Sequence, residues 1–413
     1  MPLVRPFTGL RPLPPRAAEV IAPPYDVLST EEARVRATGR PWSFLHISKP
    51  EIDLSPGTDP HAPEVYAKAA ENLRRMLAEG VLVRDPAPCC YAYRLVMDGH
   101  AQTGVVVAAS VRAYDENRIR RHELTRPDKE DDRVRQIEAL NAQTGPVLLA
   151  YPDAPQLDAV LAESTRHAPD ADVRADDGVH HTIWPIRHVE ALAAMTAAFD
   201  AMPALYIADG HHRSAAASRV AAARRAAAVR PTGEESYEYF LAVAFPHRQM
   251  RILDYNRVVR DLGGMSLEDF LARLGDVGTV APSEVPVRPS RHGQVGLYAD
   301  GRWYRLVLRP ELAEVADPVE RLDVSLLSHH VLGPMLGIRD LRTDKRIDFV
   351  GGIRGLAELE RRVDSGEMAA AFSLYPTRME DLMAVADSGQ VMPPKSTWFE
   401  PKLADGLVSH VLD

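Results

Sequence analysis

The stretch from residue 205 to residue 228 constrains the fold of this chain more than any other. Residues 205–208 form a short apolar run that favours a strand, and residues 215–228 are rich in alanine and arginine, which favour a helix. Only a short charged segment lies between them. The sequence therefore predicts a strand, a tight turn and a helix in immediate succession.

The turn gathers one carboxylate, one glycine, two imidazoles and one guanidinium, namely Asp209, Gly210, His211, His212 and Arg213. A helix N-terminus offers unpaired N–H groups and partial positive charge, which suit a phosphate group. Arg213 can add a two-point contact to phosphate, and Asp209 can hold a metal ion or accept a hydroxyl proton. The same residues also fit a helix start that Asp209 caps and whose other side chains are solvated.

Composition narrows the class of protein. A length of 413 residues predicts two or three domains, and the formal net charge of −9 argues against nucleic acid as the main partner. The two cysteines, Cys89 and Cys90, are adjacent and indicate reduced thiols rather than a disulfide framework or a zinc site. We find neither a signal peptide nor an apolar run long enough to span a membrane, so we expect a cytoplasmic protein.

We predict three segments along the chain. Residues 1–84 form an N-terminal α/β segment packed on the core, residues 85–260 alternate strands and helices as that core, and residues 261–413 form a C-terminal α+β domain. In the first segment we expect strands near residues 20–28 and 43–48, and a helix over residues 62–79 that ends at Gly80. In the core, Asp98-Gly99 predicts a hairpin turn.

A second charged cluster lies between residues 118 and 133. A solvated helix start explains most of its charges. His122 and Glu123 differ because they follow a predicted strand, a position that active-site residues favour. Arg126, Lys129 and, elsewhere, Asp26 are further candidates for a substrate cleft.

A third candidate is the C-terminal segment with Lys395, Ser396, Thr397 and Lys402. Its ammonium and hydroxyl groups could close over a phosphorylated ligand as a lid. The alternative is a tail packed by its aromatic residues, with the lysines in water. The segment lacks the glycines of a P-loop.

Seven motifs that run from end to end make the whole chain resemble the bacterial family known as domain of unknown function 1015. They are Arg5-Pro6-Phe7, Ala22-Pro23-Pro24-Tyr25-Asp26-Val27, Pro50-Glu51-Ile52-Asp53, His122-Glu123-Leu124-Thr125-Arg126, Ala208-Asp209-Gly210-His211-His212-Arg213, Asp254-Tyr255-Asn256-Arg257 and Met392-Pro393-Pro394-Lys395-Ser396-Thr397.

The strand, Asp-Gly-His-His-Arg turn and helix are also similar to the free-serine kinases of the ParB/sulfiredoxin fold. This resemblance implies an α+β fold whose mixed core is ParB/sulfiredoxin-like, and a kinase-like transferase of serine metabolism. Glu123 would act on the serine hydroxyl, Asp209 would be a metal or hydroxyl partner, and residues 210–213 would handle the phosphate. Mg²⁺ and ATP or ADP would be the cofactors, with L-serine or phosphoserine as the substrate.

Two other functions stay open at this point. One is a metal-dependent phosphatase that uses the histidines as ligands, and the other is a nucleotide-dependent, ParB-like DNA-binding protein. The kinase hypothesis requires the carboxylate of Glu123 and the turn at residues 209–213 to face one cavity.

Overall fold

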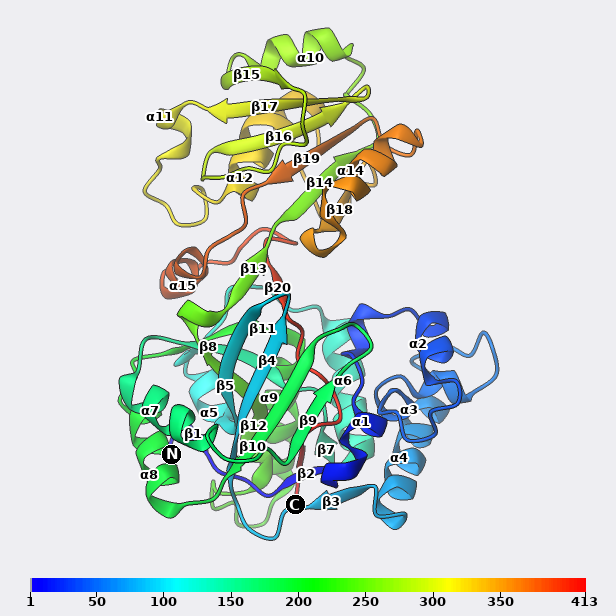
Figure 1. Ribbon diagram of the computed structural model, residues 1–413, viewed down its shortest axis with the longest axis vertical. Coiled ribbons are helices and arrows are strands. Elements are labelled where there is room, and N and C mark those ends of the chain that lie inside the picture. Colours follow the sequence, from blue (N-terminus) through cyan, green and yellow to red (C-terminus); the bar gives the residue numbers. More distant parts are fainter. Residues whose placement is uncertain (1) are drawn as a thin grey trace. The chain divides into compact units, whose positions relative to one another are not determined.

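The computed structural model describes residues 2–413, which divide into two compact units (Figure 1). One unit comprises residues 2–250 and 401–413, and the other comprises residues 251–400. Residues 2–84 share the first unit with most of the predicted core, and residues 401–413 return to that unit. The reason is that the chain leaves through β13 (Arg251–Leu253) and comes back through β20 (Trp398–Glu400), which pairs with β13.

The first unit is built on a nine-stranded mixed sheet. Its order is β6 (Ile119–Arg120), β11 (Leu205–Asp209), β8 (Val147–Tyr151), β12 (Tyr239–Pro246), β5 (His100–Ser110), β4 (Cys90–Met97), β10 (His180–Ile186) and β9 (Ala171–Arg174), with β1 (Val4–Arg5) beside β5. The predicted hairpin turn is confirmed, since Asp98 and Gly99 join β4 to β5 with positive φ angles of 51° and 77°.

Apolar side chains of the central strands form the main core of this unit. Every residue of β8 and β12 is buried, as their continuous apolar sequences predict. Leu149 and Ile207 pack in the same cluster as Phe199 and Ala216. The last two come from α8 (Val189–Asp200) and α9 (His211–Ala227), so these helices cover one face of the sheet. The other helices of this part are α5 (Val111–Asp115), α6 (Pro127–Leu140) and α7 (Pro155–Ser164).

A smaller sheet belongs to the same unit. It runs in the order β3 (Leu82–Arg84), β2 (Gly9–Pro12), β21 (Ser409–Val411) and β7 (Ala142–Gln143). The N-terminal helices pack with it around a second apolar cluster: α1 (Ala17–Val20), α2 (Thr30–Ala37), α3 (Leu45–Ser48) and α4 (Pro63–Ala78). The helix predicted over residues 62–79 is thereby confirmed.

Two predicted strands of the N-terminal segment are wrong. Residues 43–48 contain α3, because a short apolar run can serve a buried helix as well as a strand, and Leu45 and Ile47 are buried in that form. Between residues 20 and 28, only Ala22 makes a β-bridge, to Asp405. Pro23 and Pro24 follow it and cannot donate the hydrogen bonds that a longer strand needs.

The second unit holds a six-stranded sheet in the order β15 (Gly278–Ser283), β17 (Arg302–Leu308), β16 (Gln294–Ala299), β19 (Ala370–Leu374), β14 (Tyr255–Val259) and β18 (Ile347–Gly351). Its helices are α10 (Leu267–Leu274), α11 (Pro310–Ala313), α12 (Asp323–Leu327), α13 (Gly333–Leu336), α14 (Gly355–Asp364) and α15 (Met379–Asp387). The predicted α+β class is confirmed. Within residues 2–413, no helix combines the length and apolar character that crossing a membrane requires.

Candidate active site

The candidate site lies where two neighbouring strands of the large sheet end. β6 and β11 are parallel, with Leu205 opposite Ile119 and Tyr206 opposite Arg120. The carboxyl ends of parallel strands meet at the same edge of a sheet. Glu123, just after β6, therefore lies beside the turn after β11, and its Oε2 is 3.6 Å from His211 Nδ1. The fold brings together two segments that are far apart in the sequence.

Gly210 shapes the turn between β11 and α9. Its φ of 98° lies in the left-handed region that favours glycine, and its N–H donates to Asp209 Oδ1 at 2.9 Å. A Cβ at this position would lie 3.1 Å from Arg213 Nε and 3.3 Å from Val147 Cα. Glycine is therefore needed here both for the backbone angle and for space, and α9 begins at the next residue.

Two buried imidazoles lie beneath the Glu123 carboxylate. The rings of His122 and His211 meet edge to face with centroids 4.5 Å apart. Burial lowers the pKa of His122 to about 4, despite its hydrogen bond to the backbone of Ile207. Burial, and then the neighbouring His122, also lowers the pKa of His211. Both rings are neutral at pH 7, so His211 does not attract phosphate by charge.

Asp209 is ionised and surrounded by cations. Burial alone would raise its pKa, but the cations Arg213 and Lys402 outweigh this effect and hold the pKa at about 2. Arg213 Nη2 is 3.3 Å from Asp209 Oδ2, and Arg213 Nη1 donates to the carbonyl of Pro146. Arg213 is thus already bonded within the protein. Lys402, from the C-terminal segment, adds a further positive charge near the turn.

His212 connects the turn to the start of α6. Its Nε2 accepts a hydrogen bond from the Arg126 N–H at 3.1 Å. The Arg126 side chain instead pairs with Asp128 at 2.8 Å, where both are largely exposed, and Lys129 is exposed as well. The backbone of this segment, rather than its charged side chains, contacts the turn.

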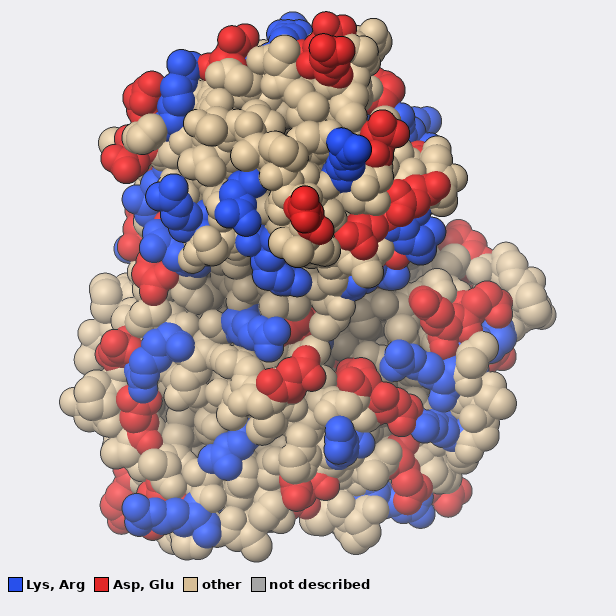
Figure 2. Space-filling model, turned by 45° about the horizontal axis from the view of Figure 1, so that its top comes forward, with Lys and Arg blue, Asp and Glu red and all other residues tan. Residues whose placement is uncertain are grey.

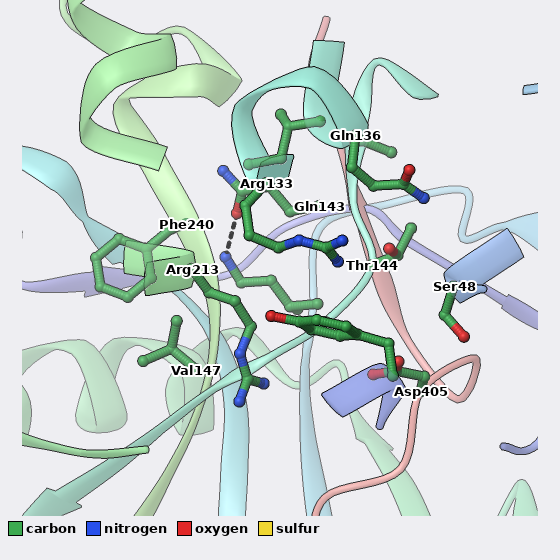
Figure 3. Close-up of a pocket in the computed structure, with 14 residues that line it drawn as sticks. Ser48, Arg133, Gln136, Gln143, Thr144, Val147, Arg213, Phe240 and Asp405 are labelled. Atoms are coloured by element: carbon green, nitrogen blue, oxygen red, sulfur yellow. Dashed lines mark hydrogen bonds between the residues drawn. The ribbon is translucent and has the colours of Figure 1, made fainter. Parts of the chain in front are cut away.

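A pocket opens on the other side of Arg213. Its lining comes from α3, α6, the β7 region, β8, α9, β12, the turn at Tyr25 and the C-terminal segment. The lining residues are Tyr25, Ser48, Arg133, Gln136, Ile137, Ala142, Gln143, Thr144, Gly145, Val147, Arg213, Phe240, Leu241 and Asp405. Figure 3 shows Arg133 and Asp405 approaching the pocket from different sides. Gln143 Oε1 accepts a hydrogen bond from the Leu241 N–H at 2.6 Å. The lining therefore combines polar and charged side chains with apolar ones such as Ile137, Val147 and Phe240.

Asp405 is the most unusual residue of this pocket. Burial raises its pKa to about 7, Arg213 and Arg133 oppose the rise, and Asp26 adds to it. The Arg133 guanidinium lies 3.8 Å from the centre of the Tyr25 ring. Because it affects the pKa of Asp405, the predicted cleft residue Asp26 lies close to this pocket.

Three residues of this pocket, Tyr25, Arg133 and Asp405, were not predicted from the sequence. Tyr25 is adjacent in sequence to the candidate Asp26, and Arg133 is the last residue of the charged cluster at residues 118–133. Both could therefore have been found from sequence features that were already recognised. Asp405 carried none, because nothing local shows that residues 401–413 return to the first unit.

Lys395, Ser396 and Thr397 belong to the second unit. Lys395 is exposed with a φ of 59°, and its carbonyl accepts a hydrogen bond from Arg257 at 3.0 Å. Ser396 Oγ donates to the Pro393 carbonyl at 2.6 Å. The proposed lid over a phosphorylated ligand stays a prediction for these three residues.

Three residues have the spacing of a metal site. One ligand atom from each of His122, Glu123 and His211 lies within 4.8 Å of the others. Asp209, the metal ligand that the sequence suggested, is outside this group, and its contact with Mg²⁺ stays a prediction.

The search of curated proteins gave no match. Among solved structures, a free serine kinase in complex with AMP is 12% identical, with 72% of this chain and 86% of that chain covered and a TM-score of 0.33. A conserved hypothetical protein from Pyrococcus furiosus is 14% identical (73% and 93% covered, TM-score 0.34). SbnI with a C-terminal truncation, from Staphylococcus aureus, is 12% identical (72% and 84% covered, TM-score 0.35).

Similarities of this size assign no activity, and the description of the core as ParB/sulfiredoxin-like stays a prediction. The family to which the chain belongs is shown by its sequence. The family model described as "Protein of unknown function (DUF1015)" matches residues 4–325, which is most of the chain. The chain belongs to this family.

Proposed function

We propose that this protein is a phosphotransferase that moves a phosphoryl group between a nucleotide and the hydroxyl of free L-serine, in either direction. The observation that carries the proposal is the 3.6 Å distance between Glu123 Oε2 and His211 Nδ1, at the N-terminus of α9. A carboxylate that can accept a hydroxyl proton thus lies beside a helix end that favours phosphate. Phosphoryl transfer depends mainly on such positioning and on charge neutralisation.

In the forward direction, Glu123 takes the proton of the serine hydroxyl. The serine oxygen then forms a bond to the γ-phosphorus of ATP, the bond from that phosphorus to the β-phosphate oxygen breaks, and ADP leaves. In reverse, phosphoserine and ADP give serine and ATP. Glu123 is suited to this role because about half of its side chain is exposed and can reach a substrate.

Phosphoryl transfer also requires that the negative charge of the phosphates be neutralised, and Asp209 and Lys402 would serve this need. The ionised Asp209 is an oxygen ligand of the kind that Mg²⁺ prefers, and Mg²⁺ would neutralise the nucleotide phosphates. Lys402 lies near Asp209 and would act on the same phosphates. The helix N–H groups after Gly210 complete the phosphate contacts.

The pocket beside Arg213 carries the charges that an amino-acid substrate needs, but with a volume of about 30 Å³ it must widen to admit serine, and Glu123 is not among its lining residues. A free amino acid carries an ammonium and a carboxylate, and both need partners when they leave water. Asp405 can accept from the ammonium, and the Arg133 guanidinium can donate to the carboxylate. A DNA-binding role has less support. Figure 2 shows basic and acidic side chains interspersed over one face, whereas nucleic-acid binders present a basic stripe.

Phosphorus NMR of the purified chain with serine, phosphoserine, ATP, ADP and Mg²⁺ tests the proposal. We expect exchange of phosphate between serine and the nucleotide, and a loss of at least about 100-fold in rate for Glu123→Gln. Glu116→Gln is the matched control, because Glu116 is an exposed glutamate that pairs with Arg112 on the surface. No exchange, or equal exchange by wild type and Glu123→Gln, refutes the proposal. Phosphate release without nucleotide would favour the metal-dependent phosphatase instead.

A further inference from the structure

The cluster of His122, Glu123 and His211 has ligand chemistry that phosphoryl transfer does not use. Two imidazoles and one carboxylate converge within 4.8 Å, and both imidazoles are almost completely buried. Imidazole is a common ligand of Zn²⁺ and of other late transition metals, whereas Mg²⁺ prefers oxygen ligands. The donor set therefore points away from the Mg²⁺ of a nucleotide.

His122 gives the independent observation. Its ring is hydrogen-bonded to the backbone of Ile207, but its Nδ1 has no hydrogen-bond partner in the part of the chain that the structure describes. The residue is only 2% exposed, so water does not satisfy this atom freely. A ring that donates to a carbonyl through one nitrogen keeps a lone pair on the other, which is how metal-binding histidines are usually oriented. An unpartnered buried lone pair is costly unless a ligand occupies it.

The other two members fit the same centre. His211 Nδ1 and Glu123 Oε2 are 3.6 Å apart. Two ligands of a tetrahedral zinc ion, each roughly 2.0–2.2 Å from the metal, are separated by about 3.4 Å. Metal binding at His211 Nδ1 moves its ring proton to Nε2, so the weak 3.5 Å contact from the His122 N–H would be lost. Glu123 is half exposed, so its carboxylate can adjust to the ion and leave the remaining positions open to water.

We infer that His122, Glu123 and His211 form a binding site for Zn²⁺ or a similar divalent transition metal, and that the bound ion inhibits phosphoryl transfer. The second part rests on the proposed function. A carboxylate bound to Zn²⁺ shares an oxygen lone pair with the metal and becomes a much weaker base towards the serine hydroxyl. The two cations therefore have opposite effects on phosphoryl transfer. Mg²⁺ supports the reaction by binding the nucleotide, and Zn²⁺ inhibits it by occupying the carboxylate of Glu123.

Metal binding is measured first, without any activity assay. Full-length protein is freed of metal with a chelator, which is then removed, and Zn²⁺ is titrated in competition with a chromophoric zinc indicator. Co²⁺ is added to a second sample as a spectroscopic probe. We expect one Zn²⁺ per chain. We also expect the visible absorption bands that Co²⁺ shows when it has four ligands. Glu123→Gln should weaken Zn²⁺ binding at least tenfold, and Glu116→Gln should not change it.

His211→Asn is a second variant, expected to abolish the Co²⁺ bands, and its thermal unfolding is recorded to verify that it folds. Binding of Zn²⁺ by Glu123→Gln as tight as by wild type, or no binding by wild type, overturns the metal site.

Inhibition is tested afterwards by adding Zn²⁺, up to twofold over protein, to the phosphate-exchange assay with excess Mg²⁺. We expect at least a tenfold loss of rate that a chelator reverses. Exchange that Zn²⁺ leaves unchanged, or increases, overturns the inhibitory role even if the ion binds. If wild type shows no exchange at all, the proposed function fails, while the titrations still decide whether the metal site exists.

Discussion

Replacing Asp405 with asparagine should make the protein more stable, and increasingly so as the pH rises. Asp405 is 2% exposed, and burial raises its pKa to about 7 although Arg213 and Arg133 favour its charged form. The folded protein thus holds the Asp405 proton more tightly than the unfolded chain does. Asparagine keeps the size of the side chain and the acceptor that faces the backbone of Tyr25, but it cannot ionise.

The magnitude follows from the two pKa values. The unfolded pKa of an aspartate lies near 4, and the folded pKa of Asp405 is about 7. Between these values the folded state binds more protons, so the free energy of unfolding falls by about 1.4 kcal/mol per pH unit, or about 4 kcal/mol in all. This loss is absent in Asp405→Asn. The stability difference in favour of the variant should therefore grow from near zero at pH 4 to as much as about 4 kcal/mol at pH 8.

Urea unfolding of both proteins at pH values from 4 to 8 measures this difference. The other titrating groups are common to both proteins, so their contributions cancel when the two curves are subtracted. Asp98→Asn is the control, since Asp98 is an exposed turn residue between β4 and β5 and its replacement should have a small effect that does not depend on pH. A difference for Asp405→Asn that stays constant from pH 4 to 8, or that favours wild type at pH 8, would refute the reasoning.

Three further substitutions test the turn, a helix start and the charge near Asp209. Gly210→Ala should lower the free energy of unfolding by about 1–2 kcal/mol for the left-handed backbone alone. The loss should exceed that of Gly39→Ala, because the Cβ of that variant would meet nothing within 4 Å. Equal losses in urea unfolding would contradict this. Ser29→Ala removes the capping box of α2 and should cost about 1 kcal/mol, and an unchanged melting temperature would speak against it. Lys402→Met should raise the pKa of Asp209 and weaken ADP binding at least fivefold by calorimetry, and unaltered affinity would remove Lys402 from the phosphate contacts.

Local patterns predicted local structure well. The hairpin at Asp98-Gly99 and the turn at Gly210 depend on backbone angles that glycine and a few other residues adopt, so a short sequence determines them. The same is true of the helix over residues 62–79. The strand predicted at residues 43–48 was wrong because burial, not local periodicity, decides whether such a short apolar run is a strand or a helix.

The candidate site was predictable only in part. Glu123 and His211 could be singled out because each stands at the end of a predicted strand, but that β6 and β11 are neighbours depends on long-range pairing that no local pattern encodes. Asp405 shows the limit more clearly. Its raised pKa arises from burial and from Asp26, against the opposing effect of Arg213 and Arg133, and these three residues come from distant parts of the chain.

The interrupted course of the first unit has a consequence for its biosynthesis. Lys402, Asp405 and β21 are supplied after the entire second unit, and β21 occupies the position between β2 and β7 in the smaller sheet. A growing polypeptide therefore holds β2 without this partner until residues 409–411 have emerged from the ribosome. During that interval the edges of β2 and β7 that β21 later covers are exposed to other chains, so these two strands are places where the growing chain can associate wrongly.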